Sequence, residues 1–215
     1  MRKLLFSNGS PFARRVRIIL EEKGLEYERD VLDAVRTVDQ IRPHNPALQV
    51  PVFFDNERRL FGSDLIVQYL LINYPNNTAR AGEEPFANVM TRSERHWEDL
   101  QILTAIGSLT DSVVNIRLLE GATKDAVPYI ARQELRIASL LDWLEPQVCP
   151  EGFWPGYFTT MDFYLFCPLV WGKHRGIFDY ELGHWPNINA MIVHWKGRRS
   201  ILATPIKPAL ETNVG

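Results

Sequence analysis

The sequence has little cysteine and no long apolar run. Only Cys149 and Cys167 are present among 215 residues, too few for a disulfide framework or a cysteine-rich zinc site. No segment reaches the roughly 18 apolar residues of a membrane helix. The opening MRKLLFSNGS also lacks the apolar stretch of a signal peptide. We therefore expect a cytoplasmic protein without a membrane partner, with Cys167 of FYLFCPLVW as a small core residue.

The sequence also lacks an excess of positive or negative charge. The chain carries 24 Lys and Arg against 26 Asp and Glu, a net charge of -2, with no long block of either sign. This balance argues against a general nucleic-acid or membrane-surface binder. An apolar content of 46% and a charged content of 23% are ordinary for a globular protein. The length suits one large or two small domains.

The first 75 residues predict an alternation of strands and helices. Ser10 and Pro11 are typical of a helix start, and Gly24 is typical of a helix end. The apolar KLLF before them predicts a buried strand. PVFF and RRLF, separated by DNE, predict a hairpin. The expected order is β-α-β-α-β-β-α, with strands at 3–6, 25–31, 51–54 and 58–61 and helices at 11–23, 33–41 and 63–74.

The rest of the chain predicts helices throughout. The polar segment PNNTARAGEEP is typical of a linker. Amphipathic stretches follow over 86–119, 124–146 and 186–201, and another begins at Thr159, where Thr159 and Asp162 have the spacing of a capping box. We expect an α/β domain over 1–76, a linker over 77–86 and an all-α domain over 87–215.

Several segments, in this order, resemble the cytosolic glutathione S-transferase family: SPFARRVRIILEEKGLEYE, NPALQVPVF, FGSDLIVQYL, FTTMDFYL and WPNINAMIVHWKGRRSI. The SPF motif is similar to that of serine-type members, among the tau, omega and beta-like bacterial or plant classes. The resemblance implies a thioredoxin-like, glutathione-binding N-terminal domain and a helical C-terminal domain. It also implies a homodimer that uses glutathione as co-substrate in detoxification, without a metal.

Ser10 has two interpretations. As a helix cap, its hydroxyl only accepts a hydrogen bond from the backbone. In the function that the resemblance implies, it donates to the sulfur of glutathione. Lowering a thiol pKa from about 8.5 by two units takes about 2.7 kcal/mol. A hydrogen bond to a charged acceptor supplies about 1.5–3 kcal/mol and the helix end about 0.3–1 kcal/mol more. Ser7 is the alternative hydroxyl.

The resemblance implies further glutathione contacts. It predicts a cis bond between Val50 and Pro51, which leaves the Val50 backbone open to pair with the cysteinyl unit as an added strand does. The other residues that we place at the glutathione site are Phe12, Arg36, Gln49, Gly62, Ser63 and Asp64. Of these, Ser63 and the helix start would bind the γ-glutamyl carboxylate, and Arg36 and Gln49 lie near the glycyl carboxylate or are solvated surface residues.

Gly62 is the main departure from the family pattern, which has Glu or Gln immediately before this serine. The missing acid would face the ammonium group of glutathione. Asp64 lies two positions further along and is a possible replacement. The departure also keeps a second class of function open, a non-catalytic protein of the same fold that acts through protein contacts.

Other charged and aromatic residues are expected to have simpler roles. We expect Arg14, Arg15 and Arg17 to form a solvated face of the first helix. His96 and Trp97 are candidates for the pocket of the electrophile, with core or interface packing as the alternative. His174, His184 and His194 recur every ten residues, which is not a metal-ligand spacing on one helix.

The sequence thus predicts a conjugating enzyme in which glutathione thiolate attacks a small apolar electrophile. Serine at position 10 disfavours thioltransferase chemistry, because a hydroxyl cannot form a mixed disulfide. A glutathione-dependent lyase, isomerase or peroxidase with the same site is the closest alternative.

Overall fold

The computed structural model describes residues 1–33, 37–75, 82–119 and 127–206. By its internal contacts the chain forms two compact units, Met1–Ala79 with Arg198–Gly215, and Arg80–Gly197. The sequence predicts one helical domain over 87–215, whereas the contacts group the last helix with the first unit. Each unit is described by itself below.

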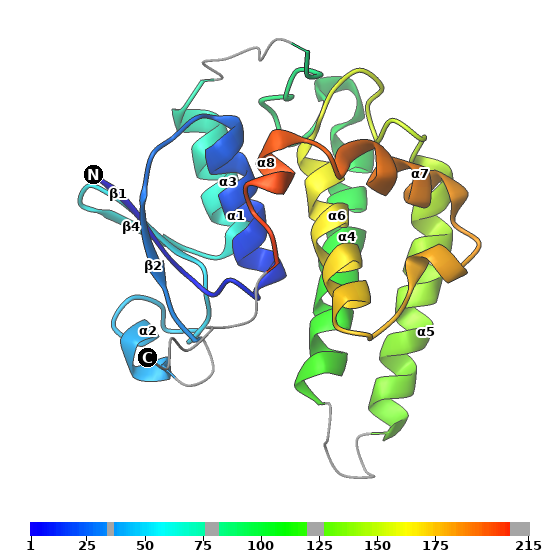
Figure 1. Cartoon of the computed structure of the whole chain (residues 1–215), viewed down its shortest axis with the longest axis horizontal. Helices are drawn as coiled ribbons and strands as arrows, with labels where there is room; N and C mark the ends of the chain where they lie inside the picture. The colour runs from blue at the N-terminus through cyan, green and yellow to red at the C-terminus, as the bar shows by residue number, and fades with distance from the viewer. Residues whose placement is uncertain (34–36, 76–81, 120–126, 207–215) are drawn as a thin grey trace. The chain divides into compact units, whose positions relative to one another are not determined.

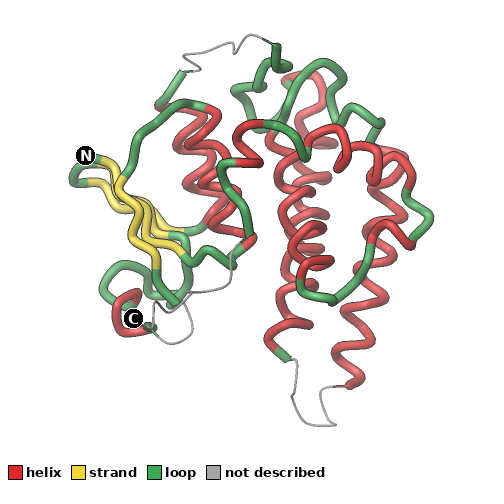
Figure 2. Tube along the Cα trace, viewed as in Figure 1, coloured by secondary structure: helices red, strands yellow, loops and turns green. Residues whose placement is uncertain are grey.

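The first unit is built on a four-stranded sheet in the order β2-β1-β3-β4, drawn in yellow in Figure 2. β1 pairs in parallel with β2, and β3 is antiparallel to both β1 and β4. The strands are β1 (Arg2–Phe6), β2 (Glu28–Val31), β3 (Val52–Asp55) and β4 (Arg58–Phe61). With its helices this is the mixed α/β arrangement expected from the sequence, although β2 is shorter than predicted.

Strand alternation divides the core between the two faces of the sheet. Leu4 lies opposite Phe53 and Leu5 lies opposite Val52, so each pair points to one face. Leu5 and Val52 pack with Leu32 and Ile41. Ile41 belongs to α2 (Val38–Ile41), the described part of the helix predicted at 33–41. α1 (Pro11–Glu22) packs against α3 (Ser63–Asn73).

α1 has the boundaries that its terminal residues dictate. The Ser10 side chain accepts a hydrogen bond from the Ala13 N–H, and Pro11 occupies the first turn, where no backbone donor is needed. Gly24 adopts a φ of +60° after the helix, and the Leu25 N–H bonds back to the Leu20 carbonyl at 2.9 Å. This is the glycine-terminated helix end that the sequence indicates.

The arginines of α1 are not a solvated face, so that expectation is wrong. Arg14, Arg15 and Arg17 are 5%, 1% and 1% exposed. The Arg17 guanidinium lies 5.2 Å from the centre of the Phe6 ring, and the Arg14 guanidinium donates to the Ile201 carbonyl. Burial lowers the pKa of Arg17 to about 10. Helical periodicity predicts only the most apolar face of α1 as buried. In the structure other parts of the chain, among them α3 and the last helix, also pack against α1, so residues outside that face are buried too.

α8 (Arg199–Leu202) is tied to α1 by a buried ion pair. The Arg198 guanidinium donates to both carboxylate oxygens of Glu22, at 2.7 and 2.9 Å, and Ser200 donates to the same carboxylate. Two hydrogen-bonded contacts offset the cost of burying these charges. The predicted helix over 186–201 is therefore two helices, α7 (Pro186–Trp195) and α8, which flank Gly197.

The second unit is helical. Its main helices are α4 (His96–Leu118), α5 (Val127–Leu144) and α6 (Thr160–His174), with α7 following. Short 3-10 turns are η1 (Ser93–Arg95), η3 (Glu145–Gln147) and η4 (Tyr180–Leu182). The capping box of Thr159 and Asp162 is confirmed, and Cys167 is fully buried as predicted. No helix in the described ranges is long and apolar enough to cross a membrane.

The prediction that a helix begins near residue 86 is wrong by ten residues. Phe86 instead forms an isolated β-bridge with Phe158. The Phe158 N–H donates to the Pro85 carbonyl at 3.0 Å and the Ala87 N–H donates to the Phe158 carbonyl at 2.9 Å. The segment is extended because its backbone pairs with residues that are distant in sequence. Arg92, which precedes α4, donates from its backbone and its guanidinium to the buried carboxylate of Asp99 in the first turn of that helix.

Candidate glutathione site

Strand pairing brings the candidate residues to one edge of the sheet. Leu5 pairs with Val52, and Val52 pairs with Phe61, so the end of β1, the start of β3 and the end of β4 lie side by side. Ser10 follows β1, Val50 precedes β3, and Ser63 follows β4 (Figure 1). Three stretches that are far apart in sequence therefore meet at this edge.

Ser10 caps α1 and still has a proton to donate. Its oxygen accepts from the Ala13 N–H at 3.2 Å, while its hydroxyl donates to no residue in the described part of the chain. The capping and the functional interpretations are thus compatible in geometry. Ser7 is 7% exposed and Ser10 is partly exposed. The Ser7 carbonyl accepts from the Ser10 N–H at 3.1 Å, which fixes the turn before the helix.

Val50 presents an open backbone beside β3. The Val50–Pro51 peptide bond is cis, as the resemblance implies. The Val50 side chain packs against the cluster of Leu5, Ile41 and Val52. Its N–H and C=O form no hydrogen bond with any described residue. Val50 is therefore anchored through its side chain while its backbone is available to an added extended segment.

Asn45 holds the loop before Val50, a role that the sequence analysis missed. Asn45 is 2% exposed, its side-chain amide donates to the Gln49 carbonyl at 2.7 Å, and its oxygen accepts from the Ala47 N–H at 2.9 Å. The Asn45-Pro46 dipeptide is the signal that could have identified this turn. Gln49 itself has an exposed side chain, and Leu48 has a φ of +58°.

The start of α3 has no side-chain cap. Gly62 is the cap residue, with a φ of +87°. Ser63 is 6% exposed and donates to the Asp64 carboxylate at 3.1 Å. The first backbone N–H groups of the helix and its positive end make this a place where a carboxylate is stabilised.

Arg15 joins this edge, although the sequence analysis placed it in solvent. Its guanidinium lies 3.5 Å from the same oxygen of Asp64 and 5.3 Å from the centre of the Phe12 ring. The Asp64 side chain is 69% exposed. Asp64 is thus already held by Ser63 and Arg15, and a ligand ammonium group would share it with them.

Of the remaining predicted residues, Phe12 contacts this edge through Arg15. Arg36 lies outside the described residues. Phe12 is partly buried under Arg15. His96 and Trp97 begin α4 in the second unit, where Trp97 is 78% exposed and the His96 Nδ1 lies 2.8 Å from the Thr91 hydroxyl. Their assignment to the electrophile pocket stays a prediction.

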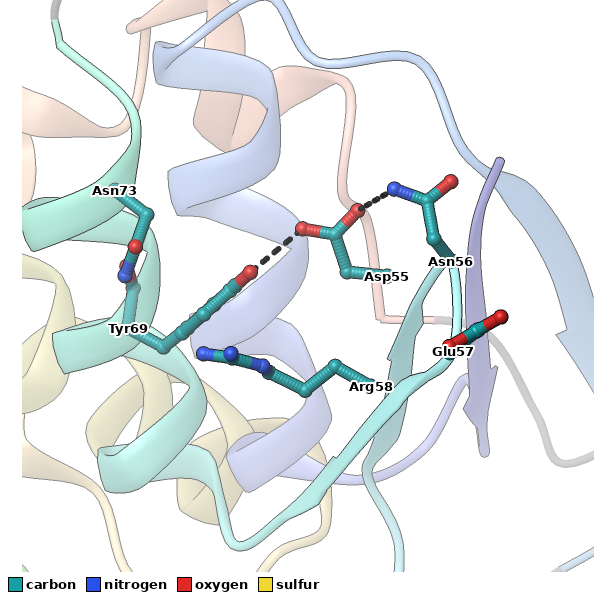
Figure 3. A pocket seen from close by; sticks show the side chains of 6 residues that line it. All are labelled: Asp55, Asn56, Glu57, Arg58, Tyr69 and Asn73. Carbon is teal, nitrogen blue, oxygen red and sulfur yellow. Dashed lines mark hydrogen bonds between the residues drawn. The ribbon is translucent and has the colours of Figure 1, made fainter.

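A shallow depression elsewhere on the first unit has a different composition (Figure 3). Tyr69 donates to the Asp55 carboxylate at 2.8 Å, Tyr74 donates to the same oxygen, and the Arg58 guanidinium lies over the Tyr69 ring. Burial and the hydrogen bond to Asp55 raise the pKa of both tyrosines. The two tyrosine hydroxyls and the Asp55 carboxylate thus satisfy one another's hydrogen bonds. They lie at the end of β3 that is opposite to Val50 and at the end of α3 that is opposite to Ser63.

Comparison with known proteins agrees with this geometry. Residues 4–78 match the family model for the glutathione S-transferase N-terminal domain. The protein named glutathione S-transferase U1 of Arabidopsis thaliana is 32% identical over 155 residues, 72% of this chain and 63% of the plant protein. A stringent starvation protein A homolog of Haemophilus ducreyi is 25% identical over 176 residues, 80% of this chain and 74% of that protein. The chain spans about half to two thirds of the length of the plant relatives it matches.

The fold has the same relatives. A glutathione S-transferase of Methylobacillus flagellatus, solved with glutathione bound, superposes with a TM-score of 0.81 at 20% identity, over 96% of this chain and 100% of the other. Residues 4–78 are thus similar to a glutathione S-transferase N-terminal domain, and the chain has the fold of the glutathione S-transferases. Its first unit is a thioredoxin-like domain, and its second is the helical domain of that fold.

Proposed function

We propose that this protein is a serine-type glutathione S-transferase, which joins the thiolate of glutathione to an electrophilic carbon of a small apolar molecule. The observation that carries the proposal is the open backbone of Val50 at the edge where Ser10 and Ser63 also lie. An extended peptide-like ligand pairs with such a backbone through both its N–H and its C=O.

Each end of the proposed site suits one part of glutathione. The uncapped start of α3, with Ser63, takes the γ-glutamyl carboxylate. The Val50 backbone takes the cysteinyl unit. The Ser10 hydroxyl then donates to the sulfur, which favours thiolate over thiol and makes it the attacking nucleophile. The new carbon–sulfur bond forms as the leaving group departs from the electrophile with its electron pair.

Ser10→Ala tests the role of the hydroxyl. We expect turnover with a chromogenic aryl halide to fall by about one to two orders of magnitude, the thiolate lost when the pKa of the bound thiol rises by about two units. Glutathione affinity should change only a few-fold, because the hydroxyl discriminates between thiol and thiolate. Steady-state kinetics and a pH titration of the thiolate absorbance of bound glutathione measure the two effects.

Ser7→Ala is the matched control, because Ser7 lies on the same turn. We expect it to retain turnover and the thiol pKa. If Ser7→Ala abolishes turnover while Ser10→Ala does not, the assignment of the hydroxyl is wrong.

A second candidate function is favoured by Gly62. Without an acid at this position, and with Asp64 already bonded to Ser63 and Arg15, the ammonium group of glutathione has a weaker partner. A non-catalytic protein that acts through protein contacts would need no such partner. The similarity to stringent starvation protein A homologs is compatible with this role. Retention on immobilised glutathione separates the two, because only the enzyme has to bind it.

A further inference from the structure

The helical unit contains a pocket of its own, of about 280 Å³. It lies between α4, α5 and the segment 177–185, which leads from α6 to α7 beside α5 (Figure 1). All of its lining residues belong to the second unit. The pocket therefore differs from the proposed glutathione site in every residue.

Two aromatic rings form fixed walls of this pocket. Phe178 rests on Gly172, where an added Cβ would lie 2.3 Å from the ring, and Trp185 rests on Gly183, where a Cβ would lie 2.1 Å from the ring. The Trp185 indole N–H also donates to Asp142 at 2.8 Å. Only glycine permits these two contacts, so the rings are seated against backbone and present preformed apolar surfaces.

The charged side chains that line this pocket are both acidic. Glu134 and Asp179 line it, and no basic side chain lines it among the described residues. Asp179 pairs with Lys173 at 3.0 Å, whereas Glu134 forms no ion pair or hydrogen bond with the described part of the chain. Ile137, which is 4% exposed, and Ile177 add apolar surface to the lining.

We propose that this pocket binds a small organic cation, with a flat aromatic body and one ammonium group. The aromatic body would bury its faces against Phe178, Trp185 and Ile137. The ammonium group would face Glu134 and gain attraction from the aromatic rings. A neutral or anionic analogue of the same shape would lack both electrostatic contributions.

The test uses three probes that share one ring system: 1-naphthylmethylammonium, 1-naphthylmethanol and 1-naphthylacetate. Calorimetric titrations of the full chain are run with saturating S-hexylglutathione present, which occupies the proposed glutathione site. We expect the ammonium probe to bind at least threefold more tightly than the alcohol, and the carboxylate probe to bind most weakly.

Two substitutions locate the binding. Ala138 lines the pocket from the exposed side of α5, so Ala138→Trp should fill it and abolish binding of the ammonium probe. Glu134→Gln should weaken that probe about threefold to fivefold and leave the alcohol unchanged. Glu151→Gln, an exposed acid of the same unit outside the pocket, is the matched control and should change neither. Circular dichroism confirms that each variant is folded.

The result that overturns the proposal is equal binding of the ammonium and alcohol probes, or binding of the ammonium probe that survives Ala138→Trp. Absence of binding by the ammonium probe overturns it as well. None of these outcomes bears on glutathione binding, which is measured without the probes.

Discussion

At the scale of single residues, Gly62 is the position where the sequence departs from the pattern of the family that it resembles. Its φ of +87° belongs to a region that residues with a Cβ rarely adopt, yet an added Cβ would meet no atom within 4 Å. The backbone conformation therefore costs any other residue about 1–2 kcal/mol, but the space for a side chain exists.

Gly62→Glu should restore the missing acid at that conformational cost. We expect Gly62→Glu to bind glutathione more tightly than Gly62→Ala by about 1 kcal/mol, the size of one partly exposed ion pair. Both variants should lose about 1–2 kcal/mol of unfolding free energy. Calorimetry and urea unfolding measure the two quantities.

Gly62→Gln is the control that keeps the size of the side chain without its charge. Equal affinity of the Glu, Gln and Ala variants would mean that position 62 does not face the ammonium group of glutathione.

The location of some residues at this edge could be predicted from the sequence, while their role in binding glutathione stays a prediction. Ser10 could be found because a helix cap leaves a local signal, and Val50 could be found because the resemblance to the glutathione S-transferases implies its cis bond and open backbone. Arg15 could not, because its burial depends on α3, which periodicity within α1 does not reveal. Asn45 has a local signal for a turn, but that signal does not reveal its hydrogen bond to the Gln49 carbonyl, which holds the loop before Val50.

At the scale of elements, the predicted helix starts are correct where neighbouring residues determine them and wrong where a distant segment does. α1 and α3 begin where predicted, because Ser10, Pro11 and Gly62 act on their own neighbours. α4 begins ten residues later than predicted, because the backbone at Phe86 pairs with Phe158. Local patterns predict helix ends that local residues determine, and they fail where a distant segment provides the hydrogen bonds.

Lys23 couples the ends of two of these elements. It follows α1, is 1% exposed, and donates to the Tyr74 carbonyl at the end of α3. Burial lowers the pKa of Lys23 to about 8, well below the value near 10.4 of an exposed lysine. Between these two values the unfolded chain binds a proton that the folded chain has released.

The unfolding free energy should therefore rise with pH above about 8, by up to about 1.4 kcal/mol per pH unit for this one group. Urea unfolding at several pH values up to about 9.5, below the range where tyrosines titrate, measures the slope. Lys23→Met should flatten it. Lys196→Met, at an exposed lysine, should retain it, and a slope that is the same in all three proteins would contradict the account.

At the scale of the whole molecule, exposed apolar side chains lie on both sides of Gly62. Phe61 and Leu65 flank the start of α3 and are 41% and 51% exposed. We propose that a second copy of the chain covers them. Light scattering should give twice the mass of one chain for the wild type, and one chain mass for the double variant Phe61→Ser with Leu65→Ser.

Ile72→Ser is the control for this dimer. Ile72 is 74% exposed on the same helix, but it lies at the opposite end of α3, so the variant should remain dimeric. A wild-type protein with the mass of one chain would exclude the proposed interface.

The central claim is that the edge formed by Ser10, Val50 and Ser63 binds glutathione. Calorimetric titration of the purified wild-type protein with glutathione at neutral pH tests it most directly. The account predicts saturable binding of one molecule per chain, with a Kd in the micromolar to low-millimolar range. Absence of detectable binding would contradict the proposed transferase, would return Ser10 to the role of a helix cap, and would favour a protein that acts through contacts with other proteins.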